Sequence, residues 1–197
     1  MKRLIILLSI PIFFGISCKK EETVVVENSS GPTVEPPYSM LHYDGSNMDA
    51  PLLGAGTYEG AARFSASQIN AFVGGEITKV WFYLKNLPQS CEVRIYQSDA
   101  GSSAPDTLLY SANVTGDMEA GRWNDHTLPN SLEIPDKDIW ISIRVVHSSD
   151  TRSLGCDPGP AIDNGDKMWT SSGGQWITLR QYDGTNINWN IRTVVLP

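Results

Sequence analysis

Apolar and polar residues alternate along three short segments of the chain, residues 77–84, 91–96 and 139–146. β-branched and aromatic side chains fill these segments, and a period of two residues places one row of side chains on each face of a strand. We therefore predict three β-strands. Residues 86–90 separate the first two strands and include Pro88, which favours a turn, so these two strands are expected to form a hairpin.

Further short segments of this kind continue to the end of the chain, separated by stretches rich in Gly, Asp, Ser and Pro. The additional predicted strands are residues 108–114, 121–128, 132–134, 167–170, 175–179 and 188–195. Only residues 65–73 have a helical pattern, with Ser65 or Ser67 as the N-cap and Gly74 ending the helix. Many short strands with frequent turns predict an all-β fold, an antiparallel β-sandwich or a barrel, with one short helix.

The alternation also predicts which side chains face the core. In the strongest strand the core-facing row is aliphatic and comprises Ile139, Ile141, Ile143 and Val145. The aliphatic rows of the other two strands are Val80, Phe82 and Leu84, and Val93 and Ile95. Because successive side chains of a strand point to opposite faces, the residues between them are expected to face outward.

The outward rows are rich in aromatic and arginine side chains. They predict one ligand-binding surface formed by Trp81, Tyr83, Arg94, Tyr96, Trp140 and Arg144. Flat rings bury a large area at low entropy cost, and arginine adds paired hydrogen bonds. In the alternative, loops cover these rings or a β-bulge turns some of them inward. The remaining tryptophans, Trp123, Trp169, Trp176 and Trp189, are assigned to core or rim packing.

The first residues of the chain combine a basic start, an apolar run and a cysteine. Lys2 and Arg3 precede an apolar run over residues 4–16, which is too short to span a bilayer as a helix. Cys18 stands where a secretory signal would be cleaved. The segment resembles a bacterial lipoprotein signal, which implies that residues 1–17 are removed and that acyl chains such as palmitate on Cys18 anchor the protein in a membrane.

Two further regions follow this signal. Residues 18–37 are expected to form a lipid-anchored flexible tether, because their prolines and polar residues show no regular period. Residues 38–197 are long enough for one binding domain with a sizeable core. The charged residues 19–22 resemble the acidic signals that direct some Gram-negative lipoproteins to the cell's outer face. The expected location is therefore the outer membrane, lipid-anchored and facing the exterior.

Net charge limits the classes of binding partner, and cysteine content limits the possible disulfides. The net charge is −7 at pH 7 and no basic cluster occurs, so nucleic acid, which needs Lys and Arg to neutralise phosphates, is excluded as a partner. Besides Cys18, the chain contains Cys91 and Cys156. In an oxidising compartment these two could form a disulfide, or they could be two small buried thiols, and the sequence leaves both readings open.

Common catalytic motifs are missing from the sequence. It contains no nucleophile elbow, zinc-protease helix motif or nucleotide-binding loop. His147 and Cys156 could act as base and nucleophile, but packing at a strand end and in a loop explains them better. No pair of carboxylates stands out for glycoside hydrolysis. We therefore expect no enzymatic activity.

An ordered series of segments resembles a jelly-roll β-sandwich module of secreted and surface proteins of Gram-negative bacteria, often found beside peptidase or adhesin domains. The segments are residues 61–64, 74–80, 93–96, 121–124, 138–141, 157–160 and 188–191. The resemblance covers nearly all of residues 38–197 and implies a single antiparallel jelly-roll sandwich without catalytic residues. The expected function is binding outside the cell, with glycan as the first ligand class. In the alternative, the module is a structural subunit that docks on a neighbouring secreted or outer-membrane protein.

A five-residue sequence occurs in similar form near both ends of this domain. Tyr-Asp-Gly-Ser-Asn at residues 43–47 returns as Tyr-Asp-Gly-Thr-Asn at residues 182–186. Asp-Gly favours a hairpin turn, because glycine accepts a positive φ. The alternative is a structural calcium ion on Asp44 and Asp183, since Ca²⁺ prefers carboxylate and carbonyl oxygens and jelly-roll binding modules often hold such an ion. No other cofactor is expected.

Overall fold

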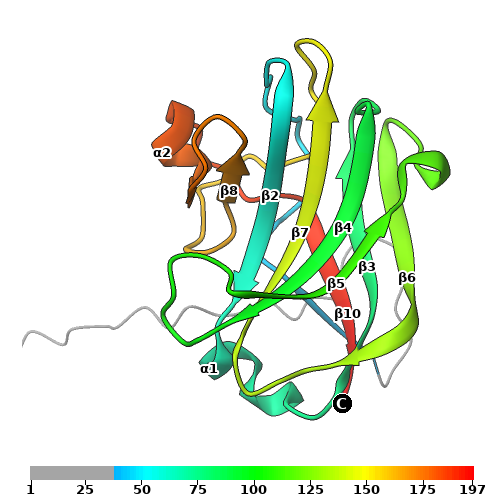
Figure 1. Ribbon diagram of the computed structural model, residues 1–197, viewed down its shortest axis with the longest axis vertical. Helices are drawn as coiled ribbons and strands as arrows, with labels where there is room; N and C mark the ends of the chain where they lie inside the picture. The colour runs from blue at the N-terminus through cyan, green and yellow to red at the C-terminus, as the bar shows by residue number, and fades with distance from the viewer. Residues whose placement is uncertain (1–37) are drawn as a thin grey trace, which may run out of the picture.

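The computed structural model describes residues 38–197, which form two β-sheets packed face to face (Figure 1). The strands are β1 (Ser39–His42), β2 (Gly56–Phe64), β3 (Glu76–Leu84), β4 (Ser90–Ser98), β5 (Thr107–Asn113), β6 (Arg122–Glu133), β7 (Asp138–His147), β8 (Lys167–Thr170), β9 (Trp176–Thr178) and β10 (Ile191–Leu196). The predicted all-β sandwich is confirmed. The predicted signal, the tether and Cys18 lie outside the described residues. Within residues 38–197, none of the helices is long and apolar enough to cross a membrane.

Successive strands repeatedly cross from one sheet to the other. The four-stranded sheet has the order β1-β10-β3-β6, and the six-stranded sheet has the order β5-β4-β7-β2-β8-β9. Without β8 and β9, this is the double four-stranded arrangement of a jelly roll, and the β8–β9 hairpin extends one sheet beyond β2 (Figure 1). The predicted hairpin of residues 77–84 with 91–96 is wrong, because β3 and β4 belong to different sheets and the chain between them crosses the end of the sandwich.

The aliphatic rows meet between the two sheets, as the alternation predicts. Their side chains are at most 2 % exposed, and they are Ile139, Ile141, Ile143 and Val145 of β7, Val80, Phe82 and Leu84 of β3, and Val93 and Ile95 of β4. Burying one such side chain contributes about 1.5–3 kcal/mol relative to leaving it in water. This shared core is therefore the main source of the stability of the sandwich.

Short helical segments connect several of the strands. α1 (Ala66–Ile69) and η1 (Asn70–Phe72) occupy the predicted helix, and η2 (Thr115–Asp117) follows β5. A further helix, α2 (Leu179–Asp183), begins after Thr178, whose side chain accepts a hydrogen bond from the backbone N–H of Gln181. It ends at Gly184, where φ is 86°, a conformation that favours glycine. Asp183 and Gly184 therefore end a helix, and the predicted hairpin turn at this position is wrong.

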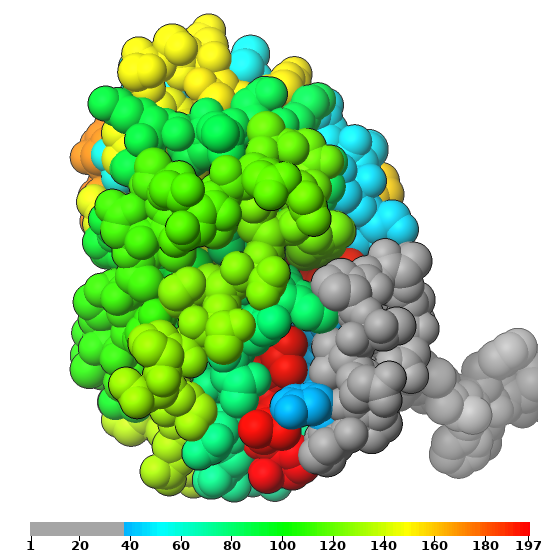
Figure 2. Space-filling view, turned by 90° about the vertical axis from the view of Figure 1, so that its right-hand side faces the viewer, coloured from blue at the N-terminus to red at the C-terminus, as the bar shows by residue number. Residues whose placement is uncertain are grey.

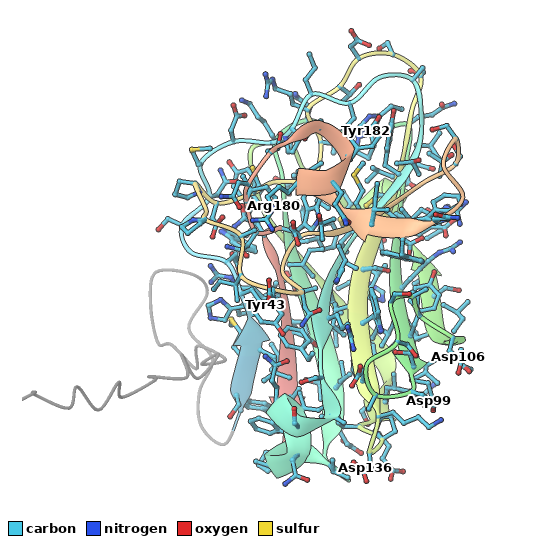
Figure 3. The ribbon with its side chains drawn as sticks, turned by 90° about the vertical axis from the view of Figure 1, so that its left-hand side faces the viewer. Tyr43, Asp99, Asp106, Asp136, Arg180 and Tyr182 are labelled. Atoms are coloured by element: carbon cyan, nitrogen blue, oxygen red, sulfur yellow. The ribbon has the colours of Figure 1, made fainter. Side chains whose placement is uncertain are left out.

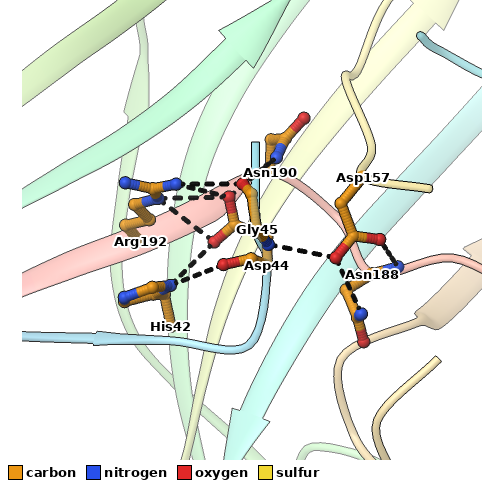
Figure 4. A network of polar contacts seen from close by, with 7 residues as sticks. All are labelled: His42, Asp44, Gly45, Asp157, Asn188, Asn190 and Arg192. Atoms are coloured by element: carbon orange, nitrogen blue, oxygen red, sulfur yellow. Dashed lines mark hydrogen bonds and ion pairs between the residues drawn. The ribbon is translucent and has the colours of Figure 1, made fainter. Parts of the chain in front are cut away.

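A buried ion pair joins the segment after β1 to the last strand (Figure 4). Arg192 donates from Nε to both carboxylate oxygens of Asp44 at 3.1 Å and from Nη2 to Oδ2 at 3.0 Å. Asn190 Nδ2 donates to Asp44 Oδ2 at 2.7 Å, and His42 Nδ1 lies 3.2 Å from Oδ1. Asp44 is 3 % exposed and Arg192 is 6 % exposed. Because a guanidinium already neutralises this carboxylate, the structure argues against calcium at Asp44.

A second carboxylate continues this network towards the loop after β7 (Figure 4). Asp157 accepts hydrogen bonds from the backbone N–H groups of Gly45, Asn188 and Gly159 and from the side chain of Asn188, at 2.8–3.0 Å. The predicted hairpin turn at Asp44 and Gly45 is also wrong, because β1 and β2 lie in different sheets. These bonds fix the segment after β1 to the loop after β7 and to the segment before β10.

The second predicted calcium ligand lies in a different setting. Asp183 is exposed at the end of α2, and its Oδ1 accepts the backbone N–H of Thr185 at 2.9 Å. Within residues 38–197, no three His, Cys, Asp or Glu side chains gather in a way that could hold a metal ion. The two halves of the sequence echo therefore have different structural roles.

Cys91 and Cys156 are free thiols, and both are buried. Cys91 lies in β4, whereas Cys156 forms isolated backbone bridges with Asp49 and Trp189. Burial raises the pKa of Cys91 to about 12 and that of Cys156 to about 11, so both thiols stay protonated at neutral pH. The structure thus shows buried thiols, and the disulfide reading is wrong.

Candidate functional site

The six residues predicted to form one binding surface lie on two opposite faces of the sandwich. Trp81 and Tyr83 belong to β3 in the four-stranded sheet, whereas the other four, Arg94, Tyr96, Trp140 and Arg144, belong to β4 and β7 in the six-stranded sheet. All six lie in the rows opposite the aliphatic rows, as the alternation predicts. A single surface containing all six does not exist, because alternation within a strand does not show which sheet the strand joins.

On the four-stranded sheet, packing covers most of the aromatic surface. β6, β3, β10 and β1 follow one another across the side seen in Figure 2. Trp81 is 5 % exposed and packs with Met40, Val194 and the half-buried Trp123. Arg192 Cζ lies 4.4 Å from the centre of the Trp123 ring. Trp81 therefore presents little ring surface to a ligand.

On the six-stranded sheet, hydrogen bonds hold Arg94 and Tyr96 in place. Glu59 of β2 is 2 % exposed, and its Oε1 accepts hydrogen bonds from Tyr96 Oη at 2.9 Å and from Ser142 Oγ at 2.6 Å. Arg94 donates to Glu92 Oε2 at 2.7 and 2.9 Å and to Tyr96 Oη at 3.1 Å. Burial and the nearby Glu59 carboxylate raise the pKa of Tyr96 to about 12. Tyr96 thus remains a protonated donor at neutral pH.

Trp140 is covered by its neighbours, which is the alternative that the sequence left open. Its ring is 0 % exposed, and its Nε1 donates to Ser98 Oγ at 2.9 Å. Arg63 Cζ lies 5.4 Å from the ring centre, and the Trp176 ring packs at 5.4 Å with an interplanar angle of 61°. A ligand on this face would contact Trp176 rather than Trp140.

Trp169 and Trp176 form the partly exposed aromatic surface of the six-stranded sheet. The two residues are direct cross-strand partners in the β8–β9 hairpin, and both are half-buried. Arg144, one of the predicted residues, lies with Cζ 5.2 Å from the centre of the Trp169 ring. The sequence interpretation assigned these two tryptophans to packing. The apolar Met168 lies between Lys167 and Trp169 in the sequence and is buried, and this short alternation is the one local sign that Trp169 faces outward.

A polar pocket of about 210 Å³ opens at the β8–β9 hairpin. It is lined by Ala161, Asp163, Asn164, Asp166, Lys167, Thr178 and Arg180. Lys167 and Thr178 are cross-strand partners one step along the same face from Trp169 and Trp176, so the pocket continues the aromatic surface. Arg180 lies on α2, at the side of the sandwich shown in Figure 3. The pocket is smaller than a typical drug-sized cavity and suits one small polar unit of a ligand.

Burial and charge shift two titratable groups in this pocket. Burial, together with the positive charge of Arg63, lowers the pKa of Lys167. Burial raises the pKa of Asp166, although the neighbouring Lys167 opposes this shift. Arg63 also donates to Asn164 Oδ1 at 3.3 Å. The pocket therefore holds charged groups that are only partly solvated, and polar ligand groups would interact with them strongly.

The candidate catalytic pair of the sequence does not form in the structure. His147 Nε2 lies 2.7 Å from Ser153 Oγ and Nδ1 lies 3.3 Å from the carbonyl oxygen of Leu53, so its ring nitrogens contact these groups rather than Cys156. Burial lowers the pKa of His147. His147 is 3 % exposed and Ser153 is 1 % exposed, which leaves a substrate little access to either group.

Comparisons with known proteins show similarity of fold only. No protein-family model matches the chain, and no curated protein is similar to it. One similar solved structure is that of the cysteine protease and lectin-like domains of Cwp84, a surface layer associated protein of Clostridium difficile, with 13 % identity and a TM-score of 0.48. The similarity covers 73 % of this chain and 33 % of that chain, so this chain spans about a third of it.

A second solved structure is that of infectious bursal disease virus Gx strain. Its identity is also 13 %, the TM-score is 0.35, and the similarity covers 86 % of this chain and 40 % of that chain. At these values neither likeness indicates a function for this protein.

Proposed function

We propose that this protein is a non-catalytic glycan-binding module anchored to the outer membrane through Cys18. The observation that carries the proposal is the Trp169–Trp176 pair beside a small pocket lined almost entirely by polar side chains. A sugar ring offers apolar C–H groups that pack on an aromatic face and hydroxyl groups that need polar partners. We call the pair and the pocket together the hairpin site.

The hairpin site has the features that such a ligand needs. Trp176 rests on the buried Trp140, and Arg144 lies against Trp169, so neither ring has to be ordered when a ligand binds. Preorganised side chains reduce the entropy cost of binding. Asn164 and Thr178 provide neutral polar groups at the pocket wall. The remaining predicted residues, Arg94 and Tyr96, support this face through their bonds to Glu59 and Glu92.

Replacing Trp176 by alanine is expected to weaken glycan binding about tenfold or more, because a central aromatic contact commonly contributes over 1 kcal/mol to binding. The measurement is binding of the purified protein to a glycan array and then to the polysaccharide it selects. Trp123→Ala is the matched control, since Trp123 is also a half-buried tryptophan but lies on the opposite sheet.

Two results would contradict this assignment. Equal binding by the wild type and a folded Trp176→Ala variant would place the glycan elsewhere. Absence of glycan binding by the folded wild type would favour the alternative function, docking on a neighbouring protein, and cross-linking on intact cells would then be the next experiment.

The anchor makes a separate prediction, based on the sequence pattern around Cys18. Cys18→Ala is expected to move the protein from the membrane fraction to the soluble fraction of the producing cells, because no acyl chain can then be attached. Incorporation of a labelled fatty acid should be lost at the same time. Cys91→Ala serves as the control, since Cys91 is a buried thiol in β4. A Cys18→Ala variant that stays membrane-bound would show that the lipoprotein reading is wrong.

A further inference from the structure

The cationic groups in and directly beside the pocket differ in how they are neutralised. Arg63 donates from Nε to Asp138 Oδ2 at 3.0 Å and forms an ion pair with the same carboxylate, which is 0 % exposed. Arg180 is exposed to solvent. Lys167 is half-buried, and its ammonium group has no hydrogen bond or ion pair within residues 38–197. Lys167 is therefore the least solvated charge in the pocket that lacks a bonded partner.

The two carboxylates of the pocket do not supply that partner. Asp163 is exposed, so water screens its charge. Asp166 is 3 % exposed, and the nearby backbone N–H of Arg180 favours its charged form. Both lie near enough to favour the charged form of Lys167, but burial and Arg63 outweigh them. A partly buried ammonium without an acceptor is unfavourable, and an acidic group of a ligand would provide one.

We propose that the hairpin site selects glycans with an acidic sugar unit, whose carboxylate or sulfate oxygen accepts a hydrogen bond from Lys167 Nζ. This inference rests on the proposed glycan-binding function. The sugar ring would lie against the Trp169–Trp176 pair, and the pocket beyond these rings would receive the acidic group. A carboxylate or sulfate adds Coulomb attraction to the hydrogen bond from the Lys167 ammonium group, which a neutral sugar oxygen does not, so Lys167 distinguishes a charged sugar from its neutral counterpart.

The test compares charged and uncharged forms of the same polymer. The probes are polygalacturonate and its methyl ester, which separate the carboxylate from its neutral form, and dextran sulfate and dextran, which do the same for sulfate. Wild-type protein is expected to bind at least one charged polymer about tenfold more tightly than its neutral partner. Lys167→Gln is expected to remove most of this difference.

Lys79→Gln is the control for this test. Lys79 is a lysine of the opposite sheet that pairs with Asp125 and lies 5.9 Å from the Trp81 ring, and its replacement is expected to leave the preference for the charged polymer unchanged. If the wild type binds charged and neutral forms equally, or if Lys167→Gln keeps the full preference, the acidic-sugar inference is wrong while glycan binding stands. If the folded protein binds no glycan of any kind, both proposals are wrong.

Discussion

Replacing Asp44 by alanine is expected to lower the free energy of unfolding by about 3–5 kcal/mol, the usual cost of removing one partner of a buried ion pair. Arg192 would keep its charge at 6 % exposure and would lose three hydrogen bonds to the carboxylate. Asn190 would lose its bond as well. The large effect comes from the buried arginine left without a counter-charge rather than from the net strength of the pair.

Urea denaturation followed by circular dichroism measures this change. Asp183→Ala is the matched control, because Asp183 occupies the same position in the second copy of the Tyr-Asp-Gly sequence but is exposed and accepts one backbone N–H group. The free energy of unfolding of the control is expected to fall by less than about 1 kcal/mol. Similar losses in the two variants would contradict the account of the buried network.

Replacing Trp140 by alanine is expected to cost about 3–5 kcal/mol of stability, the range for deleting a buried large aromatic side chain. The ring is 0 % exposed and lies among Arg63, Ser98 and Trp176. The variant would leave a cavity beneath Trp176 and remove the hydrogen bond that Ser98 accepts. Trp140→Phe keeps an aromatic ring and is expected to lose clearly less stability.

Thermal and urea unfolding of both Trp140 variants provide the measurement. If Trp140→Ala were as stable as the wild type, this result would contradict the burial of the Trp140 ring. The prediction also affects how binding data are interpreted. If Trp140→Ala lost glycan binding, the cause would be a displaced Trp176 ring, because Trp176 packs on Trp140. Trp176→Ala is therefore the variant that tests ligand contact.

The alternation along each strand predicted the core because the period of two is local. Each residue of the aliphatic rows of β3, β4 and β7 is buried where the pattern placed it. The strand with which a given strand pairs cannot be read from the local sequence. Residues 85–89 lead from β3 into the other sheet, yet their composition would equally suit a hairpin. The predicted aromatic surface was divided between two faces for this reason.

The repeated Tyr-Asp-Gly sequence also shows that a local sequence does not determine which distant residues it contacts. Asp44 is buried by contact with Arg192, which lies 148 residues further along the chain, whereas Asp183 ends a helix that is started by Thr178. Distant residues decide between these outcomes, so no local rule could separate them. The five residues alone are compatible with a turn or with an ion ligand in either copy.

The hairpin site was only partly visible in the sequence. Arg144 was predicted to be on a binding face and lies there, next to Trp169. Trp169, Trp176 and Lys167 were missed because β8 and β9 are only four and three residues long, which is too short for a convincing alternation. The pocket is formed by the loop before β8 together with residues after Trp176, and their approach depends on the folded sheet.

The central claim is that glycan binds at the hairpin site on the six-stranded sheet. The chain has six tryptophans, so its ¹⁵N-labelled indole groups provide six resolved probes in an NMR titration with oligogalacturonate and then with a neutral gluco-oligosaccharide. We predict shifts of the Trp169 and Trp176 signals, with Trp140 following its neighbour, and unchanged signals for Trp81 and Trp123 on the opposite sheet. Shifts confined to Trp81 and Trp123, or no shift with an oligosaccharide that binds, would contradict the claim.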